Sequence, residues 1–368
     1  MLYERWGHIA ADRRSDLALC DLASGRRWTF GELCAAAEAR PLDGSDFVCP
    51  SGHSPEFILD VLAAWRMHRV VCPLEPSQTP PAGPLPPAPC VHLKTTSATT
   101  GAPRLIAFTA EQLAADAENI LATMGLRPDW PNVGAISMAH PYGFSNLVLP
   151  LLLHGIPLIL APSPLPELVR QAIENQTCVT VPAVPALWRA WHEAGIISPK
   201  IRLGISAGAP LPLGLEEKVF QASGVKIHNF YGSSECGGIA YDASDAPRTD
   251  DAYVGAPMRN VVLSVRPDGC LSVRGRAVGE TYWPESTTTL GAGHFHTADL
   301  VELRDGSVFL LGRLSDQINV AGRKVSPTTI EQVLLRHRAV RDCLVFGVTS
   351  LDPVRGESIV ACVVAEPS

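Results

Sequence analysis

Residues 95–104 read Thr-Thr-Ser-Ala-Thr-Thr-Gly-Ala-Pro-Arg, a stretch in which half of the side chains carry hydroxyl groups. A proline-rich segment precedes it, and an apolar run at 105–108 leads from it into a helix-like segment at 110–124. Hydroxyls, free backbone N–H groups and the guanidinium of Arg104 together suit a flexible cradle for a polyphosphate. On composition alone, a solvated Ser/Thr linker is the better interpretation. The rest of the chain decides between the two.

Composition limits the classes of protein to be considered. The 368 residues are 46% hydrophobic and 18% charged, enough for a sizeable core and two domains. A net charge of -7 argues against a nucleic acid or an anionic membrane surface as the main partner. The ten cysteines include no Cys-x-x-Cys pair, which excludes the usual zinc spacings and indicates free thiols in a reducing compartment. Without a signal-like N-terminus or a run approaching a membrane span, we expect a soluble cytoplasmic protein.

The middle of the chain has the pattern of a parallel sheet. Short apolar runs alternate with helix-length segments at Val133–Met138, Ile156–Leu160, Cys178–Val181, Ile201–Ile205 and Val225–Phe230. Earlier, 27–33 reads as a strand turning into a helix capped by Thr29 and Glu32, and 55–68 as an amphipathic helix. The eight prolines between Pro73 and Pro89 predict an extended loop.

After Tyr253 the pattern changes to hairpins, at 261–274 and 299–311, each around an Asp-Gly turn. A small unit begins near Arg313, with a strand, a helix and two more strands. The predicted fold class is therefore α/β. A large N-terminal domain (1–312, β-rich from 253 to 312) has mainly parallel sheets flanked by helices, and a small, incomplete α+β C-terminal domain (313–368) follows.

Three further polar stretches accompany the first. Tyr231-Gly232-Ser233-Ser234-Glu235 follows a predicted strand directly, where ligands of α/β sheets collect. There Gly232 permits close backbone approach, Tyr231 can stack on a base, and Glu235 offers a hard oxygen for Mg²⁺. The segment 295–299 ends in Asp299, which could accept both hydroxyls of a ribose. The segment 312–318 carries Arg313 at the domain junction, where a hinge is expected.

The order and spacing of these stretches resemble the adenylate-forming superfamily of acyl-CoA synthetases, luciferases and peptide-synthetase adenylation domains. The family's Thr-Ser-Gly-Ser/Thr-Thr-Gly-x-Pro-Lys loop is matched by 96–104, apart from Ala98 and Arg104. Its Tyr-Gly-x-Thr-Glu, Thr-Gly-Asp and Gly-Arg-x-x-Asp-x-Ile-Lys motifs are similar to 231–235, 297–299 and 312–319. With Gly322 and 325–331, which follow the last of these, five motifs in the right order carry the resemblance, which runs from about Trp28 to the last residue.

The resemblance implies that a carboxylic acid reacts with ATP to give acyl-AMP and pyrophosphate, and that the acyl group then passes to a thiol. The acceptor would be CoA or the phosphopantetheine of an acyl or peptidyl carrier protein. By the same resemblance, residues are assigned to phosphate (Ser97, Thr99, Thr100, Gly101, Arg104), to Mg²⁺ and the α-phosphate (Glu235, Ser234), to ribose (Asp299, Arg313) and to adenine (Tyr231, Gly208). Gly232 and Ser233 are assigned to the nucleotide without a more specific role. The acyl-pocket candidates are His140, Tyr142, Phe144 and Gly232, and Phe144 fits a plain core position equally well. Thr99, Arg104, Glu235 and His140 are the catalytic candidates.

The sequence departs from the family's pattern at several positions. Ala98 stiffens the loop, Arg104 replaces a compact ammonium, and Ser315 stands at the hinge where Asp or Lys is usual. The family's small domain ends with a catalytic lysine, whereas 55 residues (314–368) follow Arg313 and none after Lys324 is lysine. We therefore expect a C-terminally short member of the family with slow adenylation. By analogy with the loss of one hydrogen-bond donor, its adenylation transition state would lack about 3–4 kcal/mol of stabilisation.

Two other functions remain open at this point. A relic that binds nucleotide or acyl-adenylate without turnover would differ only in the missing lysine. A serine hydrolase is suggested by Gly204-Ile205-Ser206-Ala207-Gly208, which fits the Gly-x-Ser-x-Gly nucleophile elbow. However, Pro210 and Pro212 lie where the elbow's helix would begin. Tyr142, Phe144 and the apolar run 178–181 indicate a hydrophobic or aromatic acid as substrate.

Overall fold

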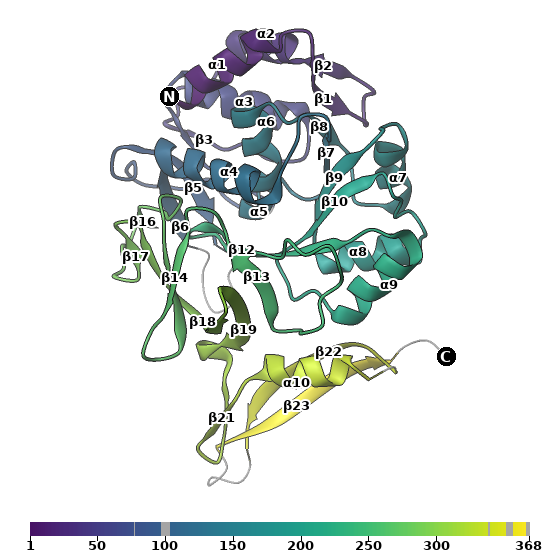
Figure 1. Ribbon diagram of the computed structural model, residues 1–368. Helices are drawn as coiled ribbons and strands as arrows, with labels where there is room; N and C mark the ends of the chain where they lie inside the picture. The colour runs from purple at the N-terminus through teal and green to yellow at the C-terminus, as the bar shows by residue number, and fades with distance from the viewer. Residues whose placement is uncertain (77, 97–103, 338, 351–355, 366–368) are drawn as a thin grey trace.

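The structure, a computed structural model, describes residues 1–76, 78–96, 104–337, 339–350 and 356–365. Its largest element is a 14-stranded sheet in the order β14-β15-β18-β19-β13-β12-β11-β10-β9-β7-β8-β1-β2, with β17 paired to β18 (Figure 1). Six strands form its parallel part: β1 (Leu17–Asp21), β8 (Leu158–Leu160), β7 (Asn132–Gly134), β9 (Val179–Ala183), β10 (Ile201–Ser206) and β11 (Ile227–Ser233). The predicted parallel sheet is confirmed, although β7 ends at Gly134 rather than at Met138.

Helices cover both faces of the parallel strands. They are α4 (Ala110–Met124), α5 (Pro141–Gly143), the π-helical turn η1 (Phe144–Val148), α6 (Leu149–His154), α7 (Pro166–Glu174), α8 (Pro185–Glu193) and α9 (Leu213–Ser223) (Figure 1). On one face, Val179 and Val181 pack with the fully buried Trp188 and Trp191 of α8. On the other, Leu203 and Ile205 pack with Phe230 and with Ile120 of α4. Because successive residues of a strand face opposite sides, both faces need apolar partners, and the alternating helices provide them.

The N-terminal elements form a second layer around a smaller sheet. Helices α1 (Leu2–Asp12), α2 (Phe30–Ala39) and α3 (Pro55–Arg66) join the main core, and β2 (Arg27–Thr29) leads into α2. Thr29 and Glu32 form the predicted capping box, and α3 buries the predicted apolar face. The smaller sheet has the order β16-β6-β5-β4-β3, with β3 (Phe47–Val48), β4 (Val70–Val71), β5 (Cys90–Thr95), β6 (Leu105–Thr109) and β16 (Thr281–Trp283).

The β-rich part continues the large sheet instead of standing apart from it. It comprises β12 (Gly237–Tyr241), β13 (Tyr253–Pro257), β14 (Val262–Val265), β15 (Cys270–Arg274), β17 (Leu290–Gly291), β18 (His294–Arg304) and β19 (Ser307–Arg313). The predicted hairpins are present as β14–β15 and β18–β19. The first half of β11 pairs in parallel with β10, and its second half pairs antiparallel with β12. One strand therefore joins the parallel and antiparallel regions.

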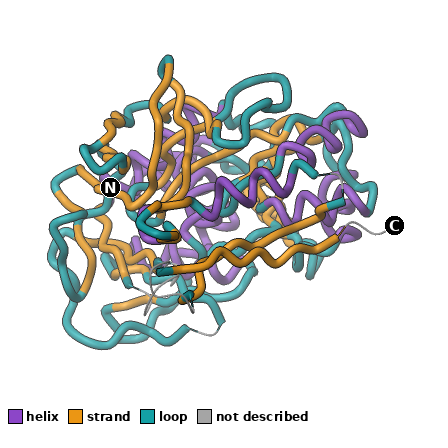
Figure 2. The backbone as a smooth tube through the Cα atoms, turned by 90° about the horizontal axis from the view of Figure 1, so that it is seen from below, coloured by secondary structure: helices purple, strands orange, loops and turns teal. Residues whose placement is uncertain are grey.

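The C-terminal unit lies at one end of the molecule, below the large sheet (Figures 1 and 2). It contains η2 (Leu314–Asp316), β20 (Ile318–Val320), β21 (Arg323–Val325), α10 (Pro327–Leu335), β22 (Val340–Thr349) and β23 (Glu357–Ala365); the sequence pattern missed β21. Two ion pairs connect it to the rest, Arg336–Asp251 at 3.0 Å and Arg341–Glu193 at 2.8 Å. In the described part of the chain, no helix is long and apolar enough to cross a lipid bilayer.

Candidate active site

The hydroxyl-rich stretch lies in the sequence between β5 and β6, which pair antiparallel. Thr95 lies opposite Leu105 in the antiparallel register. The N–H of Thr96 donates to the carbonyl oxygen of Arg104 at 2.8 Å, and the N–H of Arg104 donates to Oγ1 of Thr96 at 3.0 Å. The predicted phosphate ligands Ser97, Thr99, Thr100 and Gly101 lie outside the described residues. The hairpin fixes both ends of the loop that carries them.

Tyr282 connects Arg104, at the end of this loop, with Glu235. The guanidinium carbon of Arg104 lies 4.1 Å from the centre of the Tyr282 ring, a cation–π contact. The hydroxyl of Tyr282 donates to Oε1 of Glu235 at 2.9 Å. Burial, followed by the charge of Glu235, raises the pKa of Tyr282, so the hydroxyl remains a donor at neutral pH. The loop flank and the predicted metal ligand thus belong to one contact chain.

Glu235 occupies the turn between β11 and β12. The sequence predicts a strand that ends at Phe230, but β11 continues through Ser233, and only Ser234, Glu235 and Cys236 lie between β11 and β12. A Cβ atom on Gly232 would lie 2.7 Å from the carbonyl oxygen of Gly237, so glycine is what lets the two strands pair here. The N–H of Gly279 also holds the backbone carbonyl of Glu235, at 2.8 Å.

The carboxylate of Glu235 fits the requirements of Mg²⁺. Among the described residues only its Oε1 accepts a hydrogen bond, which leaves Oε2 for an external ligand. Mg²⁺ in nucleotide sites uses one or two carboxylates together with phosphate oxygens and water. Within the same part of the chain, no cluster of three His, Cys, Asp or Glu side chains is placed to hold an ion. Phosphate and water would therefore have to complete the coordination.

Asp299, Arg313 and Tyr231 form a second cluster. Asp299 of β18 faces Arg313 of β19 across the hairpin, and Nε of Arg313 lies 2.9 Å from Oδ1 of Asp299. The hydroxyl of Tyr231 donates to Oδ2 of the same carboxylate. Burial, followed by the charge of Asp299, raises the pKa of Tyr231. The structure thus brings the two residues predicted for the ribose, Asp299 and Arg313, together with Tyr231, which is predicted for the adenine. Each carboxylate oxygen has a second lone pair for a ligand.

Other predicted residues lie at the carboxyl ends of neighbouring parallel strands. Gly208 follows β10 with φ +84°, a left-handed conformation that favours glycine. The hydroxyl of Tyr142 donates to the carbonyl oxygen of Ala183, the last residue of β9, at 3.3 Å. Nδ1 of His140 caps α5 by accepting from the N–H of Tyr142 at 3.2 Å. This edge of a parallel sheet is where α/β proteins bind ligands.

Two predicted residues lie away from this edge. Phe144 is fully buried in the main core, 4.4 Å from the ring of His92 between centroids, which matches the core position that the sequence left open. Ser315 is exposed in η2, and its hydroxyl donates to Oδ1 of Asp316 at 2.8 Å. It lies at the junction between β19 and the C-terminal unit.

Sequence reasoning missed a buried charge network beneath the Glu235 turn. Nζ of Lys94 lies 3.2 Å from Oδ2 of Asp116 and 3.1 Å from Oγ of Ser145, and both charged side chains are 2% exposed. Oδ1 of Asp116 accepts from the N–H of Gly238 at 3.4 Å. The sequence did carry a signal for this network, because Asp116 lies on the same buried face of α4 as Leu113, Ala117 and Ile120. Tyr282, in contrast, had no sequence signal.

The nucleophile elbow is absent. Ser206 ends β10 with its side chain fully buried, whereas an elbow serine must be exposed at the start of a helix. The next helix, α9, begins seven residues later, at Leu213, with Pro212 as its N-cap. The serine-hydrolase alternative is therefore wrong, for the reason that the prolines suggested.

Comparison with known proteins identifies the family. The profile described as AMP-binding enzyme matches residues 80–284, and its C-terminal domain matches 329–368. The chain belongs to the AMP-binding enzyme family. The first match alone covers more than half of the chain and contains the β5–β6 loop, the Glu235 turn and Tyr282. The resemblance deduced from the motifs is confirmed.

Relatives of this AMP-binding enzyme include a feruloyl-CoA synthase from Amycolatopsis, 30% identical over an alignment of 283 residues that covers 71% of this chain and 57% of that protein. A 2-succinylbenzoate–CoA ligase from Bacillus cytotoxicus is 30% identical over an alignment of 289 residues that covers 73% of this chain and 59% of that protein. The chain thus spans a little over half the length of these relatives.

Solved structures confirm the α/β fold of this family member. ATP-bound MatB from Rhodopseudomonas palustris superposes with a TM-score of 0.84 at 21% identity, covering 100% of this chain and 89% of that one. MenE from Bacillus subtilis, in complex with the acyl-adenylate OSB-AMP, gives a TM-score of 0.84 at 20% identity, with coverages of 99% and 88%.

Proposed function

We propose that this chain activates a carboxylic acid with ATP, forming acyl-AMP and pyrophosphate, and then transfers the acyl group to a thiol. The contact chain from Arg104 through Tyr282 to Glu235 carries the proposal, because it links a residue that ends the proposed phosphate loop to a carboxylate suited to Mg²⁺. The Asp299–Arg313–Tyr231 cluster supports it, since Tyr231 and Glu235 belong to one hairpin. The named relatives are CoA ligases.

The residues divide the work according to their chemistry. Arg104 would neutralise charge on the triphosphate together with the loop's Ser97, Thr99, Thr100 and Gly101, and Glu235 and Ser234 would hold Mg²⁺ beside the α-phosphate. Bound Mg²⁺ would neutralise phosphate charge and orient the leaving pyrophosphate. Asp299 and Arg313 would hold the ribose, Tyr231 and Gly208 would flank the adenine, and Gly232 and Ser233 would also contact the nucleotide. No protein nucleophile is required, because two anions held in line need only positioning and charge neutralisation.

The acid is proposed to be hydrophobic or aromatic. Tyr142 lies beside Phe230, with ring centroids 6.0 Å apart, and His140 stands exposed next to it. Both named relatives act on aromatic acids, which agrees with this assignment. The thiol acceptor is proposed to be CoA, with a carrier-protein phosphopantetheine as the second possibility. These co-substrates and ten free cysteines suit the cytoplasm.

ATP–pyrophosphate exchange over a panel of aromatic and aliphatic acids tests the proposal. Acid-dependent, Mg²⁺-dependent exchange is expected, and Glu235→Gln should lower it by about 10²–10³-fold through loss of charge stabilisation. Glu217→Gln is the matched control, because Glu217 is exposed on α9 and contacts Gln221. Saturable ATP binding without exchange for any acid would instead favour a relic that binds nucleotide without turnover.

A further inference from the structure

Cys49 and Cys72 directly follow the adjacent parallel strands β3 and β4 and lie opposite each other. Val48 of β3 is paired with Val71 of β4, and the bridge between Ser51 and Leu74 continues the same offset beyond the strands. Cys49 and Cys72 fall between these pairs. The N–H of Cys72 donates to the carbonyl oxygen of Val48 at 2.8 Å. Residues directly opposite in a parallel pair point to the same face, so the two thiols lie on one side of the sheet.

This spacing meets the geometric requirement of a disulfide. Neighbouring strands lie about 4.8 Å apart. Disulfides span Cα–Cα distances of about 4.4–6.8 Å. The two sulfurs therefore need little backbone movement to bond.

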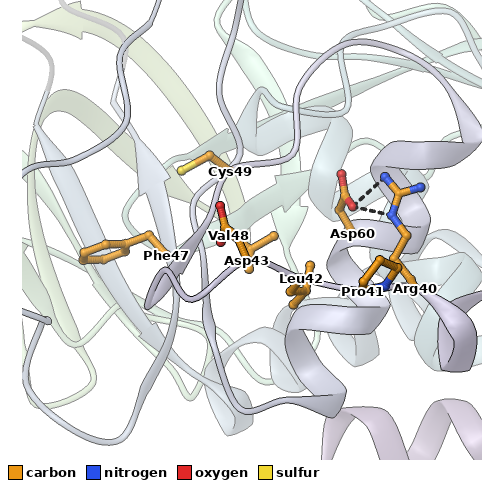
Figure 3. A pocket seen from close by; sticks show the side chains of 8 residues that line it. All are labelled: Arg40, Pro41, Leu42, Asp43, Phe47, Val48, Cys49 and Asp60. Carbon is orange, nitrogen blue, oxygen red and sulfur yellow. Dashed lines mark hydrogen bonds and ion pairs between the residues drawn. The ribbon is translucent and has the colours of Figure 1, made fainter.

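Only one of the two thiols is open to solvent. Cys72 is fully buried, whereas Cys49 is half-buried and lines a cavity of about 350 Å³ together with Asp43 and Phe47 (Figure 3). The hydrogen bond with Cys72 lowers the pKa of the Cys49 thiol, and this outweighs burial and the charge of Asp43, which raise it. Thiolate character and access are what make a cysteine reactive.

We propose that Cys49 and Cys72 form a reversible dithiol–disulfide site that hydrogen peroxide oxidises. The Cys49 thiolate attacks one peroxide oxygen, the O–O bond breaks, and hydroxide leaves, giving the sulfenic acid of Cys49. The sulfur of Cys72 then attacks the Cys49 sulfur; the S–O bond breaks, and the hydroxyl group leaves with the Cys72 proton as water. Two electrons pass from the two thiols to peroxide, and dithiothreitol reverses the change.

The test is titration of the reduced, full-length chain with hydrogen peroxide, followed by alkylation and intact mass measurement. The expected product has lost two hydrogen atoms and two alkylatable thiols per chain, and dithiothreitol restores both. Trypsin leaves Cys34 and Cys49 together in peptide 28–66 and Cys72 and Cys90 together in 70–94, so substitutions must identify the pair. Cys34→Ser and Cys90→Ser are the matched controls and should still form the bond.

Cys49→Ser and Cys72→Ser should abolish the two-hydrogen loss. In Cys72→Ser the sulfenic acid of Cys49 should persist and react with dimedone, a readout that does not depend on the bond or on catalytic activity. The proposal is overturned if the disulfide persists in Cys49→Ser, if Cys90→Ser removes it, or if Cys49 remains unmodified while the exposed Cys362 oxidises.

Discussion

Replacing Lys94 by methionine leaves the carboxylate of Asp116 buried without its ion-pair partner. The methionine side chain can follow the path of the lysine stem, beside the ring of Phe108 that Nζ approaches to 4.6 Å, so the change removes charge more than volume. Breaking a buried pair by deleting one partner costs about 3–5 kcal/mol. Domains are stable by only about 5–15 kcal/mol, so Lys94→Met should remove a large share of the stability.

Chemical denaturation of three variants measures this effect. Lys94→Met/Asp116→Asn should recover much of the loss, because an amide is neutral: its oxygen can still accept from the N–H of Gly238, and its NH₂ group can donate to the hydroxyl oxygen of Ser145. Arg127→Met is the exposed control: Arg127 and Asp129 are 56% and 58% exposed, and such pairs contribute about 0–1 kcal/mol. The reasoning is refuted if Lys94→Met costs no more than Arg127→Met, or if the double variant is no more stable than Lys94→Met.

Three further predictions concern neighbouring features. Tyr282→Phe removes a hydrogen bond to the Glu235 carboxylate, and hydrogen bonds to charged groups contribute about 1.5–3 kcal/mol. The Mg²⁺ concentration that gives half-maximal ATP–pyrophosphate exchange should therefore rise about tenfold or more. An unchanged Mg²⁺ requirement would contradict the role of Tyr282 in positioning Glu235. In denaturant titrations, Gly237→Ala should lower the free energy of unfolding by about 1–3 kcal/mol more than Gly195→Ala does. Both glycines have φ near +70°, but only a Cβ atom at Gly237 would meet another atom, Oδ1 of Asp116 at 2.1 Å. Equal losses in the two variants would refute the clash. Burial, followed by the charge of Arg5, lowers the pKa of His154 to about 4 from a model-peptide value of 6.5. Below pH 6.5 the unfolded chain therefore binds a proton at His154 that the folded protein does not bind. The free energy of unfolding should fall as the pH drops from 6.5 toward 4, by up to about 3 kcal/mol. His154→Gln should flatten this part of the stability–pH curve, and a curve of unchanged slope would count against it.

The local sequence predicted the elements best where one segment carries the whole signal. The box of Thr29 and Glu32 starts α2, the apolar face of 55–66 forms α3, and the Asp-Gly pair 305–306 turns between β18 and β19. The local sequence predicted less well those segments whose structure depends on a partner that is distant in the chain. The strand predicted to end at Phe230 continues through Ser233, because Gly232 of β11 pairs with Gly238 of β12, and that pairing depends on close backbone approach.

By itself, the sequence determined the family and the types of group in the site, since each motif is a short stretch whose residues are adjacent in the chain. Only the tertiary structure decided which of those groups meet. Tyr282 joins Arg104 to Glu235 because β16 pairs with β6, although about 180 residues separate the two strands in the chain. Lys94 likewise meets Asp116 only because α4 packs against β5. Contacts of this kind depend on sheet pairing and helix packing, and a buried charge or hydroxyl has no role until the fold supplies its partner.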